Sequence, residues 1–459
     1  MRQKTQLELA ISPEPKGEAP KREVGGTEAC AANAALESQA VVLGPSMEAI
    51  VERGNLKKAL AQVKRNKGAP GVDAMNVDEL VSYLKSHWPV IRAQLLDGTY
   101  KPQPVRRVEI PKATGGTRSL GIPTVLDRFI QQAALQVLQA AWDGSFSQGS
   151  FGFRPGRSAH QAVKRAQELT AAGHRIVVDT DIEKFFDRVN HDILMGLIAK
   201  RVADRRILKL IRGFLTAGVL EGGLVGPTDE GTPQGGPLSP LLSNLMLDVL
   251  DKELEKRGHR FVRYADDCNI YVRSYRAGER VMASVERFLE SRLKLKINRA
   301  KSAVAPPMHR KFLGFSFTNR KEPKRRIAPQ ALARLKARVR ELTRRTKGAN
   351  LARIVEELSR YLNGWRGYFG FCETPSVLRA LDEWIRRRLR AIAWKQWKRG
   401  RTRFAELRKR GVELNLAAQT AGSPHRPWRL SKSPALNLAL SKTVLSDLGL
   451  ASLAPATTV

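Results

Sequence analysis

Hydrophobic positions are spaced differently in two parts of the chain. From about residue 105 to 320, short apolar runs typical of strands alternate with longer stretches in which apolar residues recur every three or four positions, as in helices. After about residue 325 only the helical spacing remains, for example in the apolar stripe of Leu332, Leu335, Val339 and Leu342. The pattern predicts a mixed α/β body followed by an all-α region.

Two of the predicted strands lead into acidic residues. The apolar run Ile176–Val178 leads into Asp181, and the alternating segment 261–272 is interrupted by Asp266 and Asp267. The second pattern predicts a β-hairpin with a tight acidic turn. Carboxylates at the ends of neighbouring strands can converge on one point, where their mutual repulsion has to be neutralised by cations.

Hard oxygen ligands of this kind suit Mg²⁺. Two such ions about 3.5–4 Å apart can activate an attacking hydroxyl and stabilise a leaving pyrophosphate. A lone Asp-Asp pair more often marks a polar turn, but this pair follows Tyr264, lies between strand-like segments and comes after a second carboxylate. Asp179 would share a strand face with Asp181, so alternation alone does not choose between these two.

A third segment, from Ile110 to Arg118, reads as a strand, a glycine turn and a second strand. Such a hairpin would carry Lys112 and Arg118 on opposite arms, both reaching toward a common point. These cations could neutralise a triphosphate, the arginine by a two-pronged hydrogen bond and the lysine as a point charge. The alternative is ordinary surface charge in a strongly basic protein.

The charge balance indicates the class of partner. The 459 residues contain 80 Lys and Arg against 44 Asp and Glu, a formal net charge of +36. This excess indicates a polyanionic partner, most simply nucleic acid. A membrane partner is not expected, since no apolar run approaches the roughly 18 residues that span a bilayer. The acidic residues near the N-terminus do not resemble a signal peptide, and the three scattered cysteines fit a reduced, cytoplasmic protein.

Basic residues concentrate in the helical region. Residues 321–400 hold 22 Lys and Arg against 7 Asp and Glu, a local balance of 22 − 7 = +15. Such a run is usually a solvated helix face, but aromatic residues are interleaved with it: Trp365, Tyr368, Phe369, Trp384, Trp394 and Trp397. Together they predict a surface that stacks bases and follows phosphates. The aromatic run from Tyr361 to Phe369 could equally form a helical core.

Five sequence boxes occur in an order that resembles reverse transcriptases. They are Phe151–Ser158, Asp181-x4-Phe186, Gly231–Pro240, Tyr264–Asp267 and Lys311–Phe315. The first, third and last of these resemble the bacterial group II intron-encoded branch, which comprises reverse transcriptase–maturases. The similarity extends over about residues 47–450.

The resemblance implies a metal-binding catalytic triad. Asp181, Asp266 and Asp267 would hold two Mg²⁺ ions, with the backbone carbonyl of Ile182 as a further ligand.

The resemblance also implies a set of residues that contact the incoming dNTP. Lys112 and Arg118 would bind its triphosphate, while Gln234 and Lys301 would lie near the nucleotide. Phe186 matches the family's aromatic gate, a ring under C2′ of the sugar that leaves no room for a 2′-hydroxyl. The alternatives are a core aromatic for Phe186 and a solvated loop lysine for Lys301.

The implied fold is a right-hand polymerase with fingers and a ferredoxin-like palm, followed by a helical thumb and maturase domain. Residues 1–45 contain no aromatic residue and are interpreted as a disordered tail. The remaining division is 46–104 as an N-terminal extension of the fingers, 105–320 as fingers and palm, 321–400 as the thumb and maturase (X) domain, and 401–459 as a basic maturase and DNA-binding region.

The leading hypothesis is an RNA-directed DNA polymerase that copies intron RNA and assists splicing of its group II intron by binding the RNA. Its partners would be the intron RNA, an RNA template with a DNA primer, target DNA and dNTPs; the oligomeric state is open, a homodimer being one option. The alternatives are a reverse transcriptase domesticated for host defence or repair, and a polymerase-inactive RNA-binding maturase. The last 60 residues contain one histidine, His425, and no cysteine, so an HNH endonuclease is not expected and the pattern resembles the class C lineage.

Overall fold

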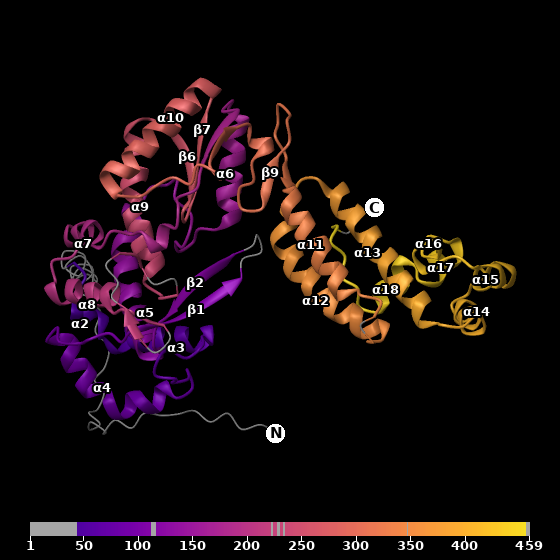
Figure 1. Cartoon of the computed structure of the whole chain (residues 1–459), viewed down its shortest axis with the longest axis horizontal. Coiled ribbons are helices and arrows are strands. Elements are labelled where there is room, and N and C mark those ends of the chain that lie inside the picture. Colours follow the sequence, from indigo (N-terminus) through magenta and orange to yellow (C-terminus); the bar gives the residue numbers. More distant parts are fainter. Residues whose placement is uncertain are drawn as a thin grey trace, which may run out of the picture.

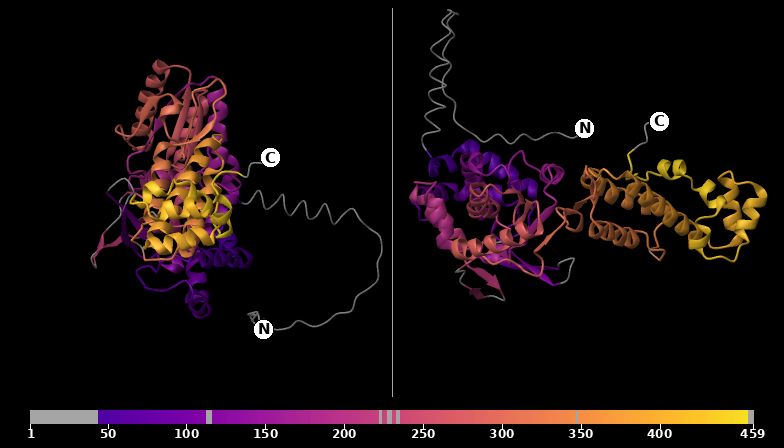
Figure 2. Two further views of the ribbon diagram at one scale, coloured as in Figure 1. Left: turned by 90° about the vertical axis from the view of Figure 1, so that its right-hand side faces the viewer. Right: turned by 90° about the horizontal axis from the view of Figure 1, so that it is seen from above.

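The computed structural model describes residues 44–111, 116–221, 224–226, 230–232, 235–346 and 348–455. This part of the chain forms two lobes: a mixed α/β lobe, and a helical arm that projects from it (Figures 1 and 2). The last strand ends at Ile327 and only helices follow it. The predicted fold class, a mixed α/β body followed by a helical region, is therefore confirmed.

A four-stranded antiparallel sheet lies at the centre of the first lobe. Its strands are β3 (Ile176–Thr180), β6 (Arg260–Tyr264), β7 (Asp267–Val272) and β8 (Ala303–Ala305), in the spatial order β6-β7-β3-β8. The helices that connect them are α7 (His191–Ala199), α8 (Arg205–Thr216), α9 (Ser239–Lys256) and α10 (Tyr275–Phe288). This strand order and the connections β3–helices–β6–β7–α10–β8 give the βαββαβ arrangement of a ferredoxin-like palm.

Both faces of this sheet are buried because successive side chains along a strand point to opposite sides. Ile176 and Val178 pack into the core that includes α9 and α10, while Val177 packs against α6 (Ala159–Ala171) on the other face. A strand buried on both sides reads as a continuous apolar run, which is why Ile176–Val178 was recognisable in the sequence.

A second four-stranded sheet lies beside the first. Its strands are β1 (Val105–Pro111), β2 (Thr117–Ile122), β4 (Val219–Glu221) and β5 (Leu224–Gly226), in the order β2-β1-β4-β5. The hairpin expected from Ile110 to Arg118 is present as the antiparallel pair β1–β2, in which Ile110 faces Arg118. Lys112 and the side chain of Arg118 lie outside what the structure describes.

Helices form the N-terminal end of the first lobe (Figure 1). They are α2 (Met47–Ile50), α3 (Arg53–Asn66), α4 (Leu80–Leu96) and α5 (Val125–Trp142). The side-chain amide of Asn55 on α3 donates to the carbonyls of Ile50 and Ala133, at 2.8 and 3.0 Å. These bonds tie α2 and α3 to α5. Short helical turns η1 (Asp143–Ser145), η2 (Phe185–Asp187), η3 (Leu289–Leu293) and η4 (Pro307–His309) complete this lobe.

The hairpin β9 (Phe315–Phe317) and β10 (Arg325–Ile327) joins the lobe to the arm. The arm consists of α11 (Pro329–Leu342), α12 (Leu351–Phe369), α13 (Pro375–Gln396), α14 (Gly400–Lys409), α15 (Leu414–Ala421), α16 (Pro427–Leu430), α17 (Pro434–Ala439) and α18 (Lys442–Asp447). No helix in the described ranges is both long enough and apolar enough to cross a membrane.

The apolar stripes of the arm helices face one another. Leu335 and Val339 of α11, Leu358 of α12 and Leu389 of α13 are completely buried in a common core. Trp394 is also completely buried there, so the expectation that it offers a stacking face to bases was wrong. Helical periodicity places Trp394 on the apolar side of α13, among the core residues.

Candidate active site

Two acidic segments meet at one end of the central sheet. Strands β6 and β7 form the expected hairpin, whose turn contains Ala265 in a left-handed backbone conformation with φ of 56°. Strands β3 and β7 are antiparallel, with Thr180 opposite Cys268. The next positions along each strand are Asp181 and Asp267, so the register brings these two residues beside each other.

The loop after β3 holds Asp181 in place. Its backbone N–H donates to the Ser302 hydroxyl at 2.9 Å, and its carbonyl accepts from the N–H of Asn298 at 2.8 Å. Lys301, on the same facing segment, places its Nζ 3.8 Å from Asp181 Oδ1. The structure therefore brings together Lys301 and Asp181, which are distant in sequence.

Repulsion among the carboxylates appears in their pKa values. Burial by surrounding protein and the charges of Asp266, Asp179 and Asp181 raise the pKa of Asp267 to about 6, although part of its side chain reaches solvent. Burial also raises the pKa of Asp181, and Asp266 adds to this shift while Lys301 opposes it. Nearby carboxylates whose pKa values are raised by burial and by neighbouring negative charge favour a counter-ion, so a bound cation would stabilise this end of the sheet.

Asp179 differs because it already has a cationic partner. Arg310 places its Nη2 2.6 Å from Asp179 Oδ2 and donates from Nε at 2.8 Å. The same guanidinium donates to the carbonyl of Lys301 at 2.6 Å. The negative charge of Asp179 is thus neutralised by a close ion pair with Arg310, whereas the distance between Lys301 and Asp181 is longer. The geometry favours Asp181 over Asp179 as the carboxylate available to a ligand.

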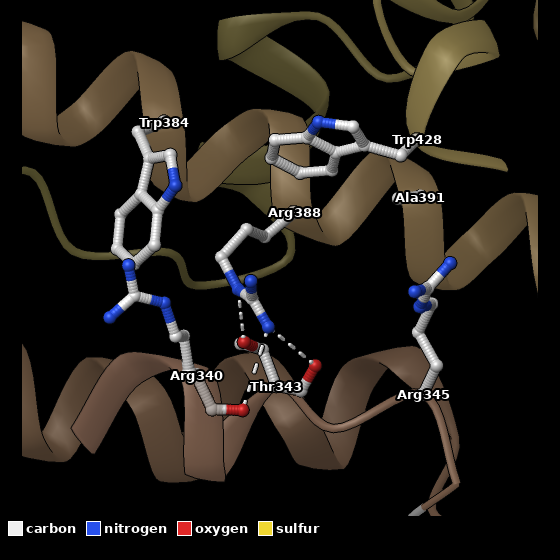
Figure 3. Close-up of a pocket in the computed structure, with 7 residues that line it drawn as sticks. All are labelled: Arg340, Thr343, Arg345, Trp384, Arg388, Ala391 and Trp428. Carbon is white, nitrogen blue, oxygen red and sulfur yellow. Dashed lines mark hydrogen bonds between the residues drawn. The ribbon is translucent and has the colours of Figure 1, made fainter. Parts of the chain in front are cut away.

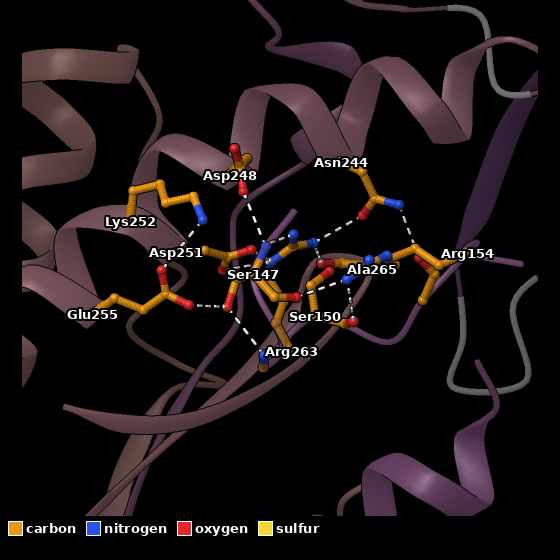
Figure 4. A network of polar contacts seen from close by, with 12 residues as sticks. Ser147, Ser150, Arg154, Asn244, Asp248, Asp251, Lys252, Glu255, Arg263 and Ala265 are labelled. Carbon is orange, nitrogen blue, oxygen red and sulfur yellow. Dashed lines mark hydrogen bonds and ion pairs between the residues drawn. The ribbon is translucent and has the colours of Figure 1, made fainter. Parts of the chain in front are cut away.

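A buried ion pair lies behind the acidic turn (Figure 4). Arg263 of β6 and Asp251 of α9 have side chains that are 0% exposed, and their closest N–O distance is 2.6 Å. Arg263 Nη1 also donates to the carbonyl of Ala265 at 2.9 Å and to Asn244 Oδ1 at 3.0 Å. The guanidinium therefore fixes the backbone of the turn from inside the protein, one residue before Asp266.

The loop that opens the Phe151–Ser158 box packs directly on this turn. A Cβ on Gly152 would lie 2.3 Å from the backbone nitrogen of Ala265, so only glycine fits. The Asn244 amide donates to the Gly152 carbonyl at 2.8 Å, and the N–H of Phe151 donates to the Arg263 carbonyl at 2.9 Å. This sequence box thus supports the acidic turn.

Phe186 lines a cavity of about 270 Å³ between strands β1, β2 and β4 of the second sheet and the segments that hold residues 186–187 and 230–232. The cavity walls include Gly121 of β2 and Thr232, whose N–H donates to the Phe186 carbonyl at 2.7 Å. The Thr232 hydroxyl is buried and has no hydrogen-bond partner within the described residues. Phe185 is buried in the core, whereas Phe186 is half-buried and borders the cavity. The core interpretation therefore describes Phe185 better than Phe186.

Comparison with known proteins identifies this arrangement. Residues 110–317 match the family described as reverse transcriptase (RNA-dependent DNA polymerase), and residues 332–411 match the group II intron maturase-specific domain. Protein YkfC of Escherichia coli (strain K12) is 35% identical over 279 residues, which cover 52% of this chain and 73% of YkfC. Group II intron-encoded protein LtrA of Lactococcus lactis subsp. cremoris is 46% identical over 159 residues. The chain belongs to the group II intron-encoded reverse transcriptase family.

The alignment with LtrA covers 34% of this reverse transcriptase and 26% of LtrA. Among solved structures, a chain of the partial Cas6-RT-Cas1–Cas2 complex is 26% identical and covers 53% of this chain and 42% of its own length, with a TM-score of 0.35. An RNA-dependent DNA polymerase domain is followed here by a maturase-specific domain, so nucleic acid is the partner of this reverse transcriptase.

Reverse transcriptase domains depend on metal ions, and the carboxylates of this one are chemically suited to Mg²⁺. Within the described ranges, no three His, Cys, Asp or Glu side chains form a ready-made metal cluster. Mg²⁺ commonly uses only one or two protein carboxylates and completes its shell with water and substrate phosphates. The neighbouring carboxylates Asp181 and Asp267, whose pKa values are both raised, fit that mode of binding.

Not every residue expected at this reverse transcriptase site can be placed. Gln234, like Lys112, lies outside the described residues. Its neighbour Gly235 approaches β2 so closely that a Cβ would lie 2.6 Å from the Gly121 carbonyl oxygen. Sequence reasoning missed the supporting residues Arg263 and Asp251. An arginine between the apolar residues of a buried strand was the available signal, because a buried charge requires a partner.

Proposed function

We propose that this reverse transcriptase copies intron RNA into DNA with the three aspartates at the β3 and β6–β7 ends, and that its helical arm holds the intron RNA during splicing. One observation carries the first part of the proposal. Asp181 and Asp267 lie side by side on antiparallel strands, and burial together with the charge of Asp266 raises the pKa of both. Such a cluster is suited to cations that also bind the phosphates of a nucleotide.

Asp181, Asp266 and Asp267 would hold two Mg²⁺ ions, with the carbonyl of Ile182 as a further ligand. Hydrogen bonds on either side of Ile182 use the carbonyl of Asp181 and the N–H of Glu183, and leave the Ile182 carbonyl out. When bound, the ions supply charge neutralisation for the attacking 3′-hydroxyl and the leaving pyrophosphate. The Arg263–Asp251 pair would keep the turn in the geometry that this transfer needs.

Five further residues would handle the incoming dNTP. Lys112 and Arg118, on the two arms of the β1–β2 hairpin, would neutralise its triphosphate. Gln234 would contact the sugar or base, and Phe186 would exclude a 2′-hydroxyl from the cavity that it lines. Lys301 would assist at the phosphates, since its ammonium group already lies beside Asp181.

The proposed division of labour follows the chain. Residues 46–104 extend the fingers, 105–320 form fingers and palm, 321–400 form the thumb and maturase domain, and 401–459 add a basic region that contacts the intron and target DNA. Splicing assistance in this proposal is RNA binding by a basic surface, while the chemistry of splicing remains with the RNA.

Primer extension on an RNA template with dNTPs and Mg²⁺ tests the proposal. Asp266→Ala should abolish DNA synthesis but leave the affinity for intron RNA within a factor of about two, because a carboxylate at the metal site adds nothing to the phosphate contacts. Asp192→Ala is the matched control, since Asp192 is an exposed aspartate that pairs with Arg212. Undiminished synthesis by Asp266→Ala would refute the assignment. A wild-type protein that binds and splices its intron but never extends a primer would favour the polymerase-inactive maturase.

A further inference from the structure

A basic, aromatic pocket lies in the helical arm, away from the acidic site (Figures 1 and 3). It has a volume of about 260 Å³ and is bordered by α11, α13 and α16. Its walls are Arg340, Thr343, Arg345, Trp384, Arg388 and Trp428. The residues from α11 and α13 belong to the matched maturase-specific domain, whereas Trp428 on α16 lies beyond its end.

The positive charge of this pocket has no acidic partner among the described residues. Within the described part of the chain, no acidic side chain forms an ion pair with Arg340, Arg345 or Arg388. Burial lowers the pKa of Arg388, and the nearby Arg340 and Arg345 lower it further. Three clustered guanidinium groups without an anion repel one another, so a bound phosphate would stabilise the pocket.

One of these arginines is held rigidly. Arg388 Nε donates to the Thr343 hydroxyl at 2.6 Å, and its Nη2 donates to the Thr343 carbonyl at 3.3 Å (Figure 3). Arg345, by contrast, extends from the other side of the pocket and forms no hydrogen bond with the residues drawn in Figure 3. The pocket thus combines a fixed cation with one that can adjust to a ligand.

The aromatic walls are suited to a planar ligand. Trp428 is 37% exposed, and the guanidinium of Arg387 lies 3.8 Å from its ring centroid. The Trp384 ring lies against Arg388, whose guanidinium carbon is 5.4 Å from the ring centroid. Indole and guanidinium planes are the surfaces on which proteins stack unpaired bases.

We propose that this pocket binds one unpaired nucleotide of single-stranded RNA, with its base against Trp428 and its phosphate between Arg340 and Arg345. The proposal rests on the proposed RNA-holding role of the arm and assigns it a site. RNA is chosen because two of the three helices belong to a maturase-specific domain. A wider basic groove lined by Arg344 and Lys395 continues from the pocket and could follow the adjoining backbone.

The test measures binding of a short single-stranded RNA to the full chain while a saturating primer–template occupies the polymerase site. Trp428→Ala should weaken this binding about ten-fold, and Trp428→Phe, which keeps an aromatic face, should restore most of it. Arg345→Ala should reduce the slope of log affinity against log salt by about 0.7, the value for one phosphate contact on a single strand. Arg360→Ala is the control, because Arg360 is an exposed arginine of α12 paired with Glu356.

Three outcomes would overturn the proposal that this pocket binds a nucleotide. They are no binding of RNA beyond the primer–template, an unchanged RNA affinity in Trp428→Ala, or an equal loss of affinity for single-stranded and duplex RNA in that variant. Single-stranded DNA of the same sequence, bound as tightly as RNA, would overturn the choice of RNA. Primer extension in the same samples keeps the proposed function separate. If the wild-type protein neither extends primers nor binds intron RNA, the proposed function is contradicted. If the wild-type protein does both and Trp428→Ala behaves identically, only the proposal that the pocket binds RNA is contradicted.

Discussion

The two charged sites of this reverse transcriptase are built in opposite ways. In the first lobe, carboxylates gather at the end of a sheet, and a fully buried ion pair between Arg263 and Asp251 fixes the turn that carries Asp266. In the arm, arginines gather around a cavity and have no acidic partner in the described ranges. Paired buried charges fix geometry, whereas clustered like charges create a site for a counter-ion. The first site is therefore suited to cations, and the second is suited to the phosphate that we propose for it.

The largest expected effect is on the stability of the first lobe, which the buried pair of Arg263 and Asp251 should maintain. Asp251→Asn leaves the charge of Arg263 buried without its partner, and should destabilise the first lobe by about 3–5 kcal/mol. Thermal and denaturant unfolding measure this change. The exposed pair of Asp192 and Arg212 is the control, because Asp192→Asn should cost no more than about 1 kcal/mol. Equal losses of unfolding free energy in the two variants would show that the buried pair stabilises the lobe no more than an exposed pair does.

A second variant disturbs the turn without changing any charge. Gly152→Ala places a methyl group against the backbone nitrogen of Ala265 and should displace the acidic turn. A shift of about 1 Å at reacting groups can cost about 100-fold in rate. We expect kcat for nucleotide addition to fall by that order while RNA affinity is kept. Gly196→Ala is the control, since its added Cβ would meet no atom within 4 Å. A normal kcat in Gly152→Ala would separate the 151–158 loop from catalysis.

A smaller effect tests the cavity that Phe186 lines beside the second sheet. Phe186→Val removes the ring that borders the cavity, and should raise the use of rNTPs relative to dNTPs roughly ten-fold, the scale on which a pocket discriminates by one small group. Phe186→Tyr keeps the ring and should keep the preference. Competition between matched rNTP and dNTP pairs in primer extension measures the ratio. An unchanged ratio in Phe186→Val would assign this side chain to packing alone.

Local sequence patterns were sufficient to predict the elements that carry the acidic site. The apolar run Ile176–Val178 and the alternation around Asp266 describe strands whose pattern depends on their own residues and on burial of the sheet faces. The choice of Asp181 rested on its spacing to Phe186 and on the family resemblance, and the roles of both residues stay predictions. The ferredoxin-like order of the strands followed from the family resemblance.

The supporting contacts could not be read in this way because they join residues through space. Asn244 of α9 meets Gly152 only once the fold is complete. The arm pocket likewise joins Arg340, Trp384 and Trp428, which belong to three different helices. Interleaved aromatic and basic residues indicated a binding surface, yet the pattern could not tell Trp394, which is fully buried, from Trp384, which lines the arm pocket.

The central claim is that one metal site joins the β3 end to the β6–β7 turn, and metal-directed backbone cleavage tests it most directly. Fe²⁺ in place of Mg²⁺, with ascorbate and peroxide, releases hydroxyl radicals that cut the chain next to the bound ion. The account predicts cuts near both Asp181 and Asp266 in the wild-type protein with primer–template and dNTP, suppressed by excess Mg²⁺ and lost together in Asp266→Ala. Cuts near only one of these segments, or cuts that survive Asp266→Ala, would contradict a shared metal site.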